Sequence, residues 1–281
     1  MQPDDSLIQE VGSLSYIQQD SDFKMESQAA TRGVLELKGG FGMKPDRFFY
    51  SATGALFLVL TTIGFQHYIF GGKHFNGSPI EPAMLATVVA HSSSVFAWYV
   101  LFFVQSLLIS TQNRRLHMKL GWSVLLVASM IAVTGPLVAV RSTRTATFGA
   151  IVFDWPGPQF LLIMFTEIAL FVTFVAIGVL NRKRPRVHRP MMVLASLAIL
   201  SGATGRIAWV NSIFGFHTWM ALFGPVVALG ALLLLVRSLM TRRLDREFAF
   251  GYAALTLATV VAARLAVTNV WVNWAGTILK F

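Results

Sequence analysis

The sequence predicts an all-α protein, a polytopic membrane bundle of seven transmembrane helices. The first observation is composition: hydrophobic residues make up 55% of the 281 residues and charged residues 13%, whereas a soluble domain holds about 25% charged residues. The second is length, because the apolar stretches are close to the ~20 residues that a helix needs to cross a bilayer. The third is an alternation of basic and nearly uncharged loops, which predicts the orientation.

Residues 1–46 are a separate, polar segment ahead of the first apolar stretch. They hold eight acidic and four basic residues, so their formal charge is −4; because the whole chain carries +10, residues 47–281 carry +14. No apolar core of a signal peptide precedes residue 48. We expect a disordered cytoplasmic tail at 1–46, with room for a short amphipathic helix that docks on a protein partner, and a transmembrane domain at 47–281.

Seven apolar stretches follow the tail. Three of them begin at a proline, namely Pro82, Pro158 and Pro190, as expected for the first turn of a helix, where a missing N–H leaves no hydrogen bond unmade. Pro136 and Pro225 fall inside the third and the sixth stretch and predict kinks there. The stretches cover residues 48–70, 82–111, 119–140, 158–181, 190–214, 219–240 and 248–279.

Basic residues concentrate in every second loop. Loops 112–118, 181–189 and 241–247 carry two, five and three Lys or Arg residues, and the loops between them carry one, two and none. Positively charged loops stay in the cytoplasm, so the N-terminus is expected inside and the C-terminus outside. The net charge of +10 therefore reflects topology in a lipid bilayer, and we exclude nucleic-acid binding.

The stretch 82–111 holds one ionisable residue well inside its apolar run, His91. Trp98 and Gln105 follow at seven-residue steps, so the three side chains form a stripe on one face of a helix. Because a histidine in hydrocarbon is costly unless it faces protein or a cavity, we expect this face to point inward.

Four ionisable residues are predicted well within the spans: His91, Glu167, Arg206 and Arg264. At ~1.5 Å per residue, with side chains leaning towards the helix N-terminus, all four tips reach roughly 8–12 Å below the outer surface. We expect Glu167 to pair with one arginine, since an unpaired buried charge costs several kcal/mol. The second arginine makes the site net positive and predicts a small polar or anionic ligand, or a proton relay through His91. The alternative stays open that the arginines reach lipid headgroups and that a Glu–Arg pair only fixes helix packing.

The histidines also suggest a b-type haem. Bis-histidine ligation needs two rings at one depth, and His117 and His188 match, both at the cytoplasmic edge. His67 lies ~13 Å higher than His91, which disfavours a second haem. A single haem b on His117 and His188 is therefore the alternative cofactor, with an interfacial role of the two histidines as the simpler interpretation. No cysteine, HExxH motif or carboxylate cluster is present, so no other metal site and no reaction are predicted.

Two segments of the sequence resemble each other. Arg115-Leu116-His117 and Arg186-Val187-His188 each follow a basic loop and open an apolar stretch. The second and third stretches and the fourth and fifth are therefore candidates for related hairpins. The alternative is that basic residues and histidine independently favour the cytoplasmic interface.

The polar residues of the spans also carry a resemblance to known proteins. The succession His91…Trp98…Gln105, then Leu116-His117 with Leu120-Gly121, then His188-Arg189 with Met191-Met192 and Arg206, resembles a widespread group of bacterial multi-pass membrane proteins without assigned function. More distantly, it is similar to the bundles of membrane-bound b-type cytochromes. The resemblance covers roughly the first six stretches. It implies a location in the bacterial inner membrane and draws attention to His91, His117 and His188.

The leading hypothesis is thus a binding or relay protein with an outward-facing site. His91, Glu167, Arg206 and Arg264 would form it, with Trp98 and Gln105 on the same stripe. A haem protein is the second hypothesis, and a structural or assembly subunit that uses the tail for a partner is the third. A transporter is disfavoured, because inverted symmetry and broken helices with a site near the midplane are not evident from the sequence.

Overall fold

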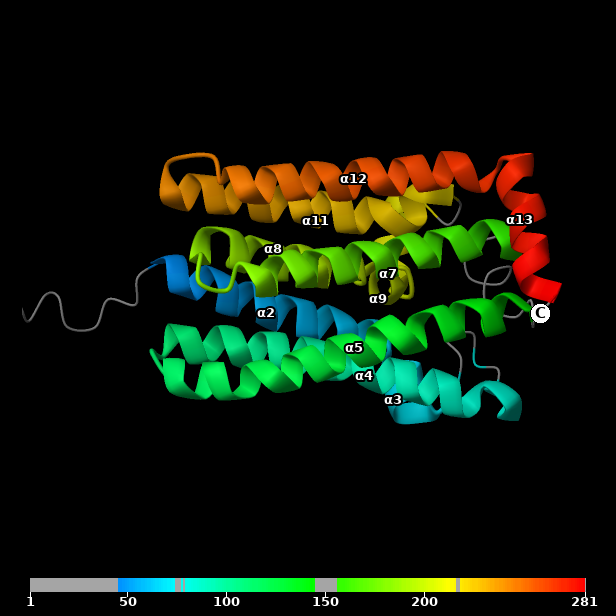
Figure 1. The fold of residues 1–281 in the computed structure, drawn as a ribbon, viewed down its shortest axis with the longest axis horizontal. Helices are drawn as coiled ribbons and strands as arrows, with labels where there is room; N and C mark the ends of the chain where they lie inside the picture. The colour runs from blue at the N-terminus through cyan, green and yellow to red at the C-terminus, as the bar shows by residue number, and fades with distance from the viewer. Residues whose placement is uncertain (1–44, 74–76, 78, 145–155, 216–217, 281) are drawn as a thin grey trace, which may run out of the picture. The chain divides into compact units, whose positions relative to one another are not determined.

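Helices packed side by side make up the part of the chain that the structure, a computed structural model, describes (Figure 1). The described residues are 45–280, apart from 74–76, 78, 145–155 and 216–217. Nearly all of the predicted tail at 1–46 lies outside them. The helices are α2 (Pro45–Gly64), α3 (Gln66–Gly71), α4 (Pro82–Ser110), α5 (Arg114–Arg144), α7 (Gly157–Leu180), α8 (Pro185–Ala198), α9 (Ser201–Thr204), α10 (Ala208–Phe214), α11 (Thr218–Thr241), α12 (Arg246–Ala266) and α13 (Asn269–Lys280).

Within the described residues, five helices are long and apolar enough to cross a membrane: α4, α5, α7, α11 and α12. The number becomes six if α8, α9 and α10, which are bent by 99°, count as one span. The apolar part of α2, Phe48–Gly64, is shorter. The described part of the chain is therefore helical and apolar, as the sequence predicts for a multi-pass membrane protein.

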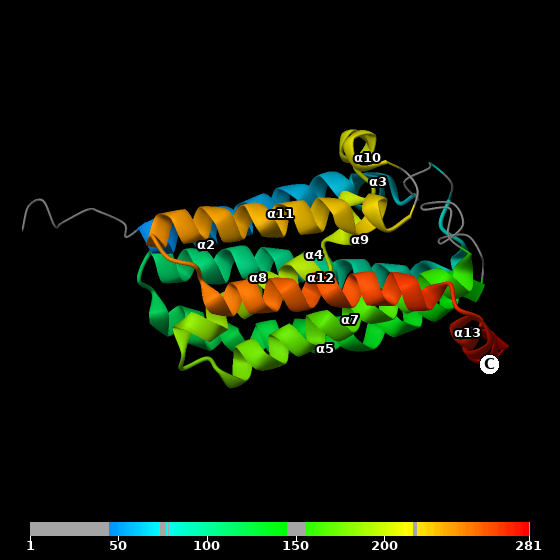
Figure 2. The same cartoon turned by 90° about the horizontal axis from the view of Figure 1, so that it is seen from above.

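Three predicted stretches are divided in the structure. The stretch 48–70 becomes α2 and α3. The stretch 248–279 becomes α12 and α13, and α13 turns across the ends of α5 and α7 (Figures 1 and 2). Two side chains join α13 to these ends: Trp271 Nε1 donates to the Pro158 carbonyl at 2.6 Å, and Arg144 Nη2 donates to the Ile278 carbonyl at 3.3 Å.

The stretch 190–214 is also divided, which corrects the prediction of one continuous helix. The helix begins at Pro185 rather than at Pro190, and it ends at Ala198. A four-residue helix, α9, follows, and Ile207 is extended with φ −92° and ψ 109° before α10 begins. The sequence Ser201-Gly202-Ala203-Thr204-Gly205 explains the weakness, because glycine, serine and threonine favour the helix less than alanine or leucine.

Side chains replace the backbone hydrogen bonds that the broken helix loses. Backbone carbonyls without a partner cost several kcal/mol each in a membrane, so a break survives only where other donors reach them. Three donors do so here: the Tyr99 hydroxyl to Ser196 O at 2.8 Å, Arg206 Nη1 to Gly202 O, and Asn211 Nδ2 to Gly205 O at 2.7 Å.

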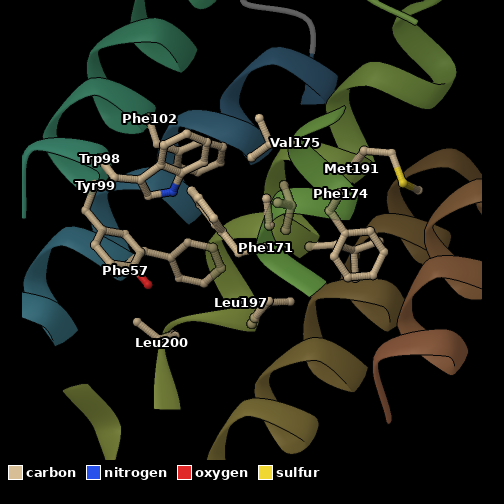
Figure 3. Packing of buried hydrophobic residues seen from close by; sticks show 14 of the residues in the cluster. Phe57, Trp98, Tyr99, Phe102, Phe171, Phe174, Val175, Met191, Leu197 and Leu200 are labelled. Carbon is tan, nitrogen blue, oxygen red and sulfur yellow. The ribbon is translucent and has the colours of Figure 1, made fainter. Parts of the chain in front are cut away.

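Aromatic residues from α2, α4 and α7 form the core beside α8 (Figure 3). The rings of Trp98 and Phe171 meet edge to face, with their centroids 4.7 Å apart, and Trp98 Nε1 donates to Ser196 Oγ at 3.1 Å. Trp98 and Gln105 are both buried. The predicted stripe on residues 91, 98 and 105 thus faces inward.

Candidate functional site

A cavity of about 130 Å³ lies between α4, α5, α7 and the broken helix. Cavities of about 150 Å³ lined by apolar side chains accept molecules as large as benzene. Most of this lining is apolar, and His91, Glu167 and Arg206 contribute polar groups to it. The structure therefore brings together three of the four ionisable residues that the sequence predicted to meet. The other lining residues include Phe65, Tyr68, Val88, Ser92, Gly135, Ser142, Phe160 and Gly202.

The hydrogen bond of His91 determines which ring nitrogen carries the proton in the neutral side chain. His91 Nδ1 lies 3.1 Å from Thr134 Oγ1, and the Thr134 hydroxyl itself donates to the Met130 carbonyl at 2.7 Å. Because the hydroxyl hydrogen is used there, Nδ1 is the donor to Thr134. The neutral ring then presents Nε2 as an acceptor.

Gly135 on α5 leaves the space in which the His91 ring lies. A Cβ at this position would be 3.5 Å from His91 Cε1 and 2.7 Å from Ile168 Cδ1. A larger residue would therefore displace the end of the Ile168 side chain. The glycine allows α4, α5 and α7 to approach closely around the cavity.

Glu167 receives a hydrogen bond from the broken helix. The Ser201 hydroxyl, at the start of α9, donates to Glu167 Oε1. The expectation was a direct pair with an arginine, whereas the partner that the structure gives this carboxylate is Ser201. Arg206 acts through space, since its charge is within electrostatic range of both Glu167 and His91.

Arg206 lies at the break, between α9 and α10, where protein groups surround its guanidinium. Nη1 donates to the Gly202 carbonyl, and Cζ lies 5.0 Å from the centroid of Phe65 and 5.6 Å from that of Tyr68. A cation over an aromatic face is stabilised by about 0.5–2 kcal/mol. The guanidinium is thus held by a carbonyl and two rings at the edge of the cavity.

Gly64 allows the rings of Phe65 and Tyr68 to lie close to the break. It is the last residue of α2, and a Cβ there would lie 2.3 Å from the Ala203 carbonyl oxygen. The end of α2 therefore packs directly on the backbone of α9. The next residue, Phe65, consequently reaches Arg206.

The structure does not bring Arg264 into the cavity, and this corrects the prediction. Arg264 is in the last turn of α12 and is exposed. Counting residues along a helix gives the depth of a side chain in the membrane. It does not give the rotation of the helix about its axis, which decides whether that side chain faces the cavity. The cavity therefore holds one carboxylate and one guanidinium, and the expectation of a net positive site is wrong.

Trp98 and Gln105 also lie outside the cavity lining. Trp98 packs in the aromatic core. The buried side-chain amide of Gln105 has no hydrogen-bond partner among the described residues. Its backbone carbonyl lies 3.3 Å from His117 Nδ1.

His117 and His188 take equivalent places in two hairpins. His117 lies in the first turn of α5 and contacts the Gln105 carbonyl near the end of α4. His188 lies in the first turn of α8, and its Nδ1 is 2.8 Å from the Gly178 carbonyl near the end of α7. No group of three or more His, Cys, Asp or Glu side chains in the described part of the chain could hold a metal ion.

Sequence reasoning missed a second buried charge, at the opposite end of the bundle. Arg237 on α11 is 9% exposed, and its Nε lies 3.4 Å from Asp245 Oδ2. Cζ is 5.4 Å from the centroid of the Tyr50 ring. Asp245 also accepts from Phe248 N at 3.2 Å and so caps α12. This cluster joins the α11–α12 hairpin to α2, which is a structural role.

The sequence also gave no sign of Ser201, Phe65 or Tyr68 as parts of the site. A run of small residues beside an intramembrane arginine was the one available signal for the break.

Comparisons with protein-family models, curated proteins and solved structures find no match. Function is therefore argued from the cavity.

Proposed function

We propose that the protein is a multi-pass protein of the bacterial inner membrane whose intramembrane cavity binds a small molecule. One observation carries the proposal: His91, Glu167 and Arg206, from three separate segments, line one cavity beside a broken helix. Ionisable groups in a membrane are expensive and mark functional sites by default. Broken helices form the binding sites of many membrane proteins, because their irregular backbone lines a cavity.

The proposed topology has seven spans, with the N-terminus in the cytoplasm. In it α2 is the first span and α8 to α10 together are the fifth. In support, Figure 1 shows the turns α4–α5, α7–α8 and α11–α12 at the end of the bundle where α2 begins. The loops 112–118, 181–189 and 241–247 at this end together carry ten Lys or Arg residues, and the alternate loops carry three. The cavity lies towards the other end, so it would face outward.

Thiol labelling tests this orientation cleanly, because the chain has no cysteine. Arg182 and Lys73 are both exposed and lie in turns on opposite sides in the proposed topology. A membrane-impermeant maleimide should label Lys73→Cys in intact spheroplasts and Arg182→Cys only after permeabilisation. The reverse pattern would invert the topology.

Binding is tested with three compact probes on the purified full-length protein: benzyl alcohol, toluene and benzoate. At least one should raise the Tm of the wild type in a saturable way, since a ligand that binds only the folded state stabilises it. Val88 lines the cavity, whereas its neighbour Val89 is 49% exposed. Val88→Phe should therefore abolish the shift, and Val89→Phe should keep it. If no probe shifts the wild type, or Val88→Phe responds equally, the proposal is wrong.

A second candidate is a single haem b on His117 and His188, and one observation favours it. Each histidine places Nδ1 against a backbone carbonyl, and such a bond leaves Nε2 as the lone pair for a metal. His117 and His188 would hold the haem through their Nε2 atoms, and the haem would supply one-electron transfer when bound. The two carbonyl contacts would orient the rings.

An absorption spectrum tests this candidate. Protein purified after haem supplementation should show a Soret band, and His117→Ala and His188→Ala should each lose it. His67→Ala is the matched control, because His67 is exposed and far from both along the chain. A wild-type sample without a Soret band would eliminate haem.

A further inference from the structure

We infer that the ligand of the cavity is a compact apolar molecule that carries a neutral hydrogen-bond donor, such as a hydroxyl group, and not an anion. This inference rests on the proposed function and names the chemical class of its ligand. It reverses the expectation of an anionic ligand that the sequence supported. It follows from which polar atoms of the lining are already used by the protein.

Arg206 is the charged side chain of the described lining that would attract an anion, and its Nη1 is engaged by the protein. Arg206 donates to the Gly202 carbonyl and lies over the rings of Phe65 and Tyr68. Recognition of a carboxylate or phosphate by arginine needs the guanidinium fork to face the ligand with two parallel N–H groups. An anion would have to displace contacts that hold the arginine in place.

The carboxylate, in contrast, keeps capacity to accept. An ionised carboxylate has about four lone-pair positions on two oxygens, and the Ser201 hydroxyl donates to Oε1 of Glu167. Oε2 remains as an acceptor on a residue that lines the cavity. An incoming anion would meet this carboxylate as a like charge, which costs energy in a low-dielectric site.

His91 and Ser92 of the lining offer acceptors too. Neutral His91 uses Nδ1–H on Thr134, so Nε2 is a lone pair. The hydroxyl of Ser92 donates to the Val89 carbonyl at 3.3 Å. Its hydrogen is thus used within its own helix, and its oxygen keeps a lone pair.

The charge balance of the cavity favours a neutral ligand over a cationic one. Glu167 would attract an ammonium group, but the charge of Arg206 acts on the same space. Burying an ammonium group without a full partner is costly. A hydroxyl donor satisfies an unfilled acceptor without adding charge, and its apolar body fits the remaining lining, which is mostly hydrocarbon.

The same three probes separate this inference from the proposed function, because they match in size and differ in chemistry. Toluene lacks the donor of benzyl alcohol, and benzoate replaces it with a negative charge. Dissociation constants are obtained by titrating each probe against the Tm and subtracting the response of Val88→Phe. The constant for benzyl alcohol should be about tenfold lower than that for toluene or benzoate, as expected for one hydrogen bond to a buried charged acceptor.

The possible outcomes distinguish a failure of this inference from a failure of the proposed function. Toluene or benzoate binding as tightly as benzyl alcohol would overturn the inference and leave a small-molecule site in place. No binding of any probe would overturn the proposed function and the inference with it. Glu167→Gln supplies an amide donor and removes the charge, so it should reduce the preference for benzyl alcohol over benzoate at least threefold. Arg264→Ala, at an exposed position outside the cavity, should leave the preference unchanged.

Discussion

The hairpins α4–α5 and α7–α8 begin alike and end differently. In each, a histidine in the first turn of the second helix contacts a carbonyl near the end of the first: His117 with Gln105, and His188 with Gly178. Helix α5 is 31 residues long in all, whereas α8 ends after 14. The shared contact strengthens the interpretation of the two segments as related hairpins.

The difference shows what a broken span requires. Helix α5 also contains a glycine–proline pair, Gly135-Pro136, and yet it remains helical throughout. At the break that follows α8, Tyr99 of α4 supplies a donor to a backbone carbonyl, and so do Arg206 and Asn211. Weak helix formers alone therefore do not end a helix in a membrane; donors from elsewhere must also replace the lost backbone bonds.

The break also makes the site. It turns Ser201 towards Glu167 and leaves Arg206 beside the cavity. The bend of 99° is a broken helix, so one of the two features whose absence disfavoured a transporter is present. The unbroken hairpin α4–α5 contributes His91 and the helix face against which its ring packs. The hairpin α7–α8, with the break that follows it, contributes the charged residues Glu167 and Arg206.

The largest effect is expected where α2 touches the break. Gly64→Ala places a methyl group within 2.3 Å of the Ala203 carbonyl oxygen, and backbone cannot move aside as a side chain does. Overpacking of this kind costs about 3 kcal/mol, so the Tm should fall by about 6 °C or more. Gly121→Ala is the matched control on α5, since a Cβ there meets nothing within 4 Å. Equal stability of the two variants would show that α2 does not pack on α9.

A smaller loss is expected from removing one of the replacement donors. Asn211→Leu leaves the Gly205 carbonyl without its side-chain donor in a buried place, at a cost of about 1–3 kcal/mol. Hydrogen exchange should accelerate at the amides of 200–207 and not in α5. Ser129→Ala, on the unbroken helix, removes an exposed hydroxyl that bonds only within its own helix and should be neutral. Unchanged exchange in Asn211→Leu would mean that the break does not need this donor.

Much of the architecture could be predicted because hydrocarbon imposes simple rules. Apolar length located the long helices to within a few residues, for example 82–111 against Pro82–Ser110. The cost of burying charge correctly predicted that His91 and Glu167 turn towards a common space. These rules depend on composition along the chain, which a single sequence provides.

Other features depend on contacts between distant segments, which the sequence does not reveal. The break needs a donor from Tyr99, about a hundred residues before the carbonyl that it serves. The exposure of Arg264 depends on how α12 is rotated, and its depth says nothing about that. The partner of Glu167 changed for the same reason, since Ser201 reaches it only once the helix has ended at Ala198.

The smallest effects should come from the two histidines that the hairpins share. His117→Phe and His188→Phe each remove one contact to a backbone carbonyl, worth about 1 kcal/mol. The contact of His188 is shorter, at 2.8 Å against 3.3 Å, so its loss should lower the Tm slightly more. His67→Phe, at an exposed position, should change nothing. If instead one histidine variant is neutral and the other is strongly destabilised, the two contacts are not equivalent. The interpretation of the two segments as related hairpins would then fail, because it requires the two histidines to stabilise their hairpins in the same way.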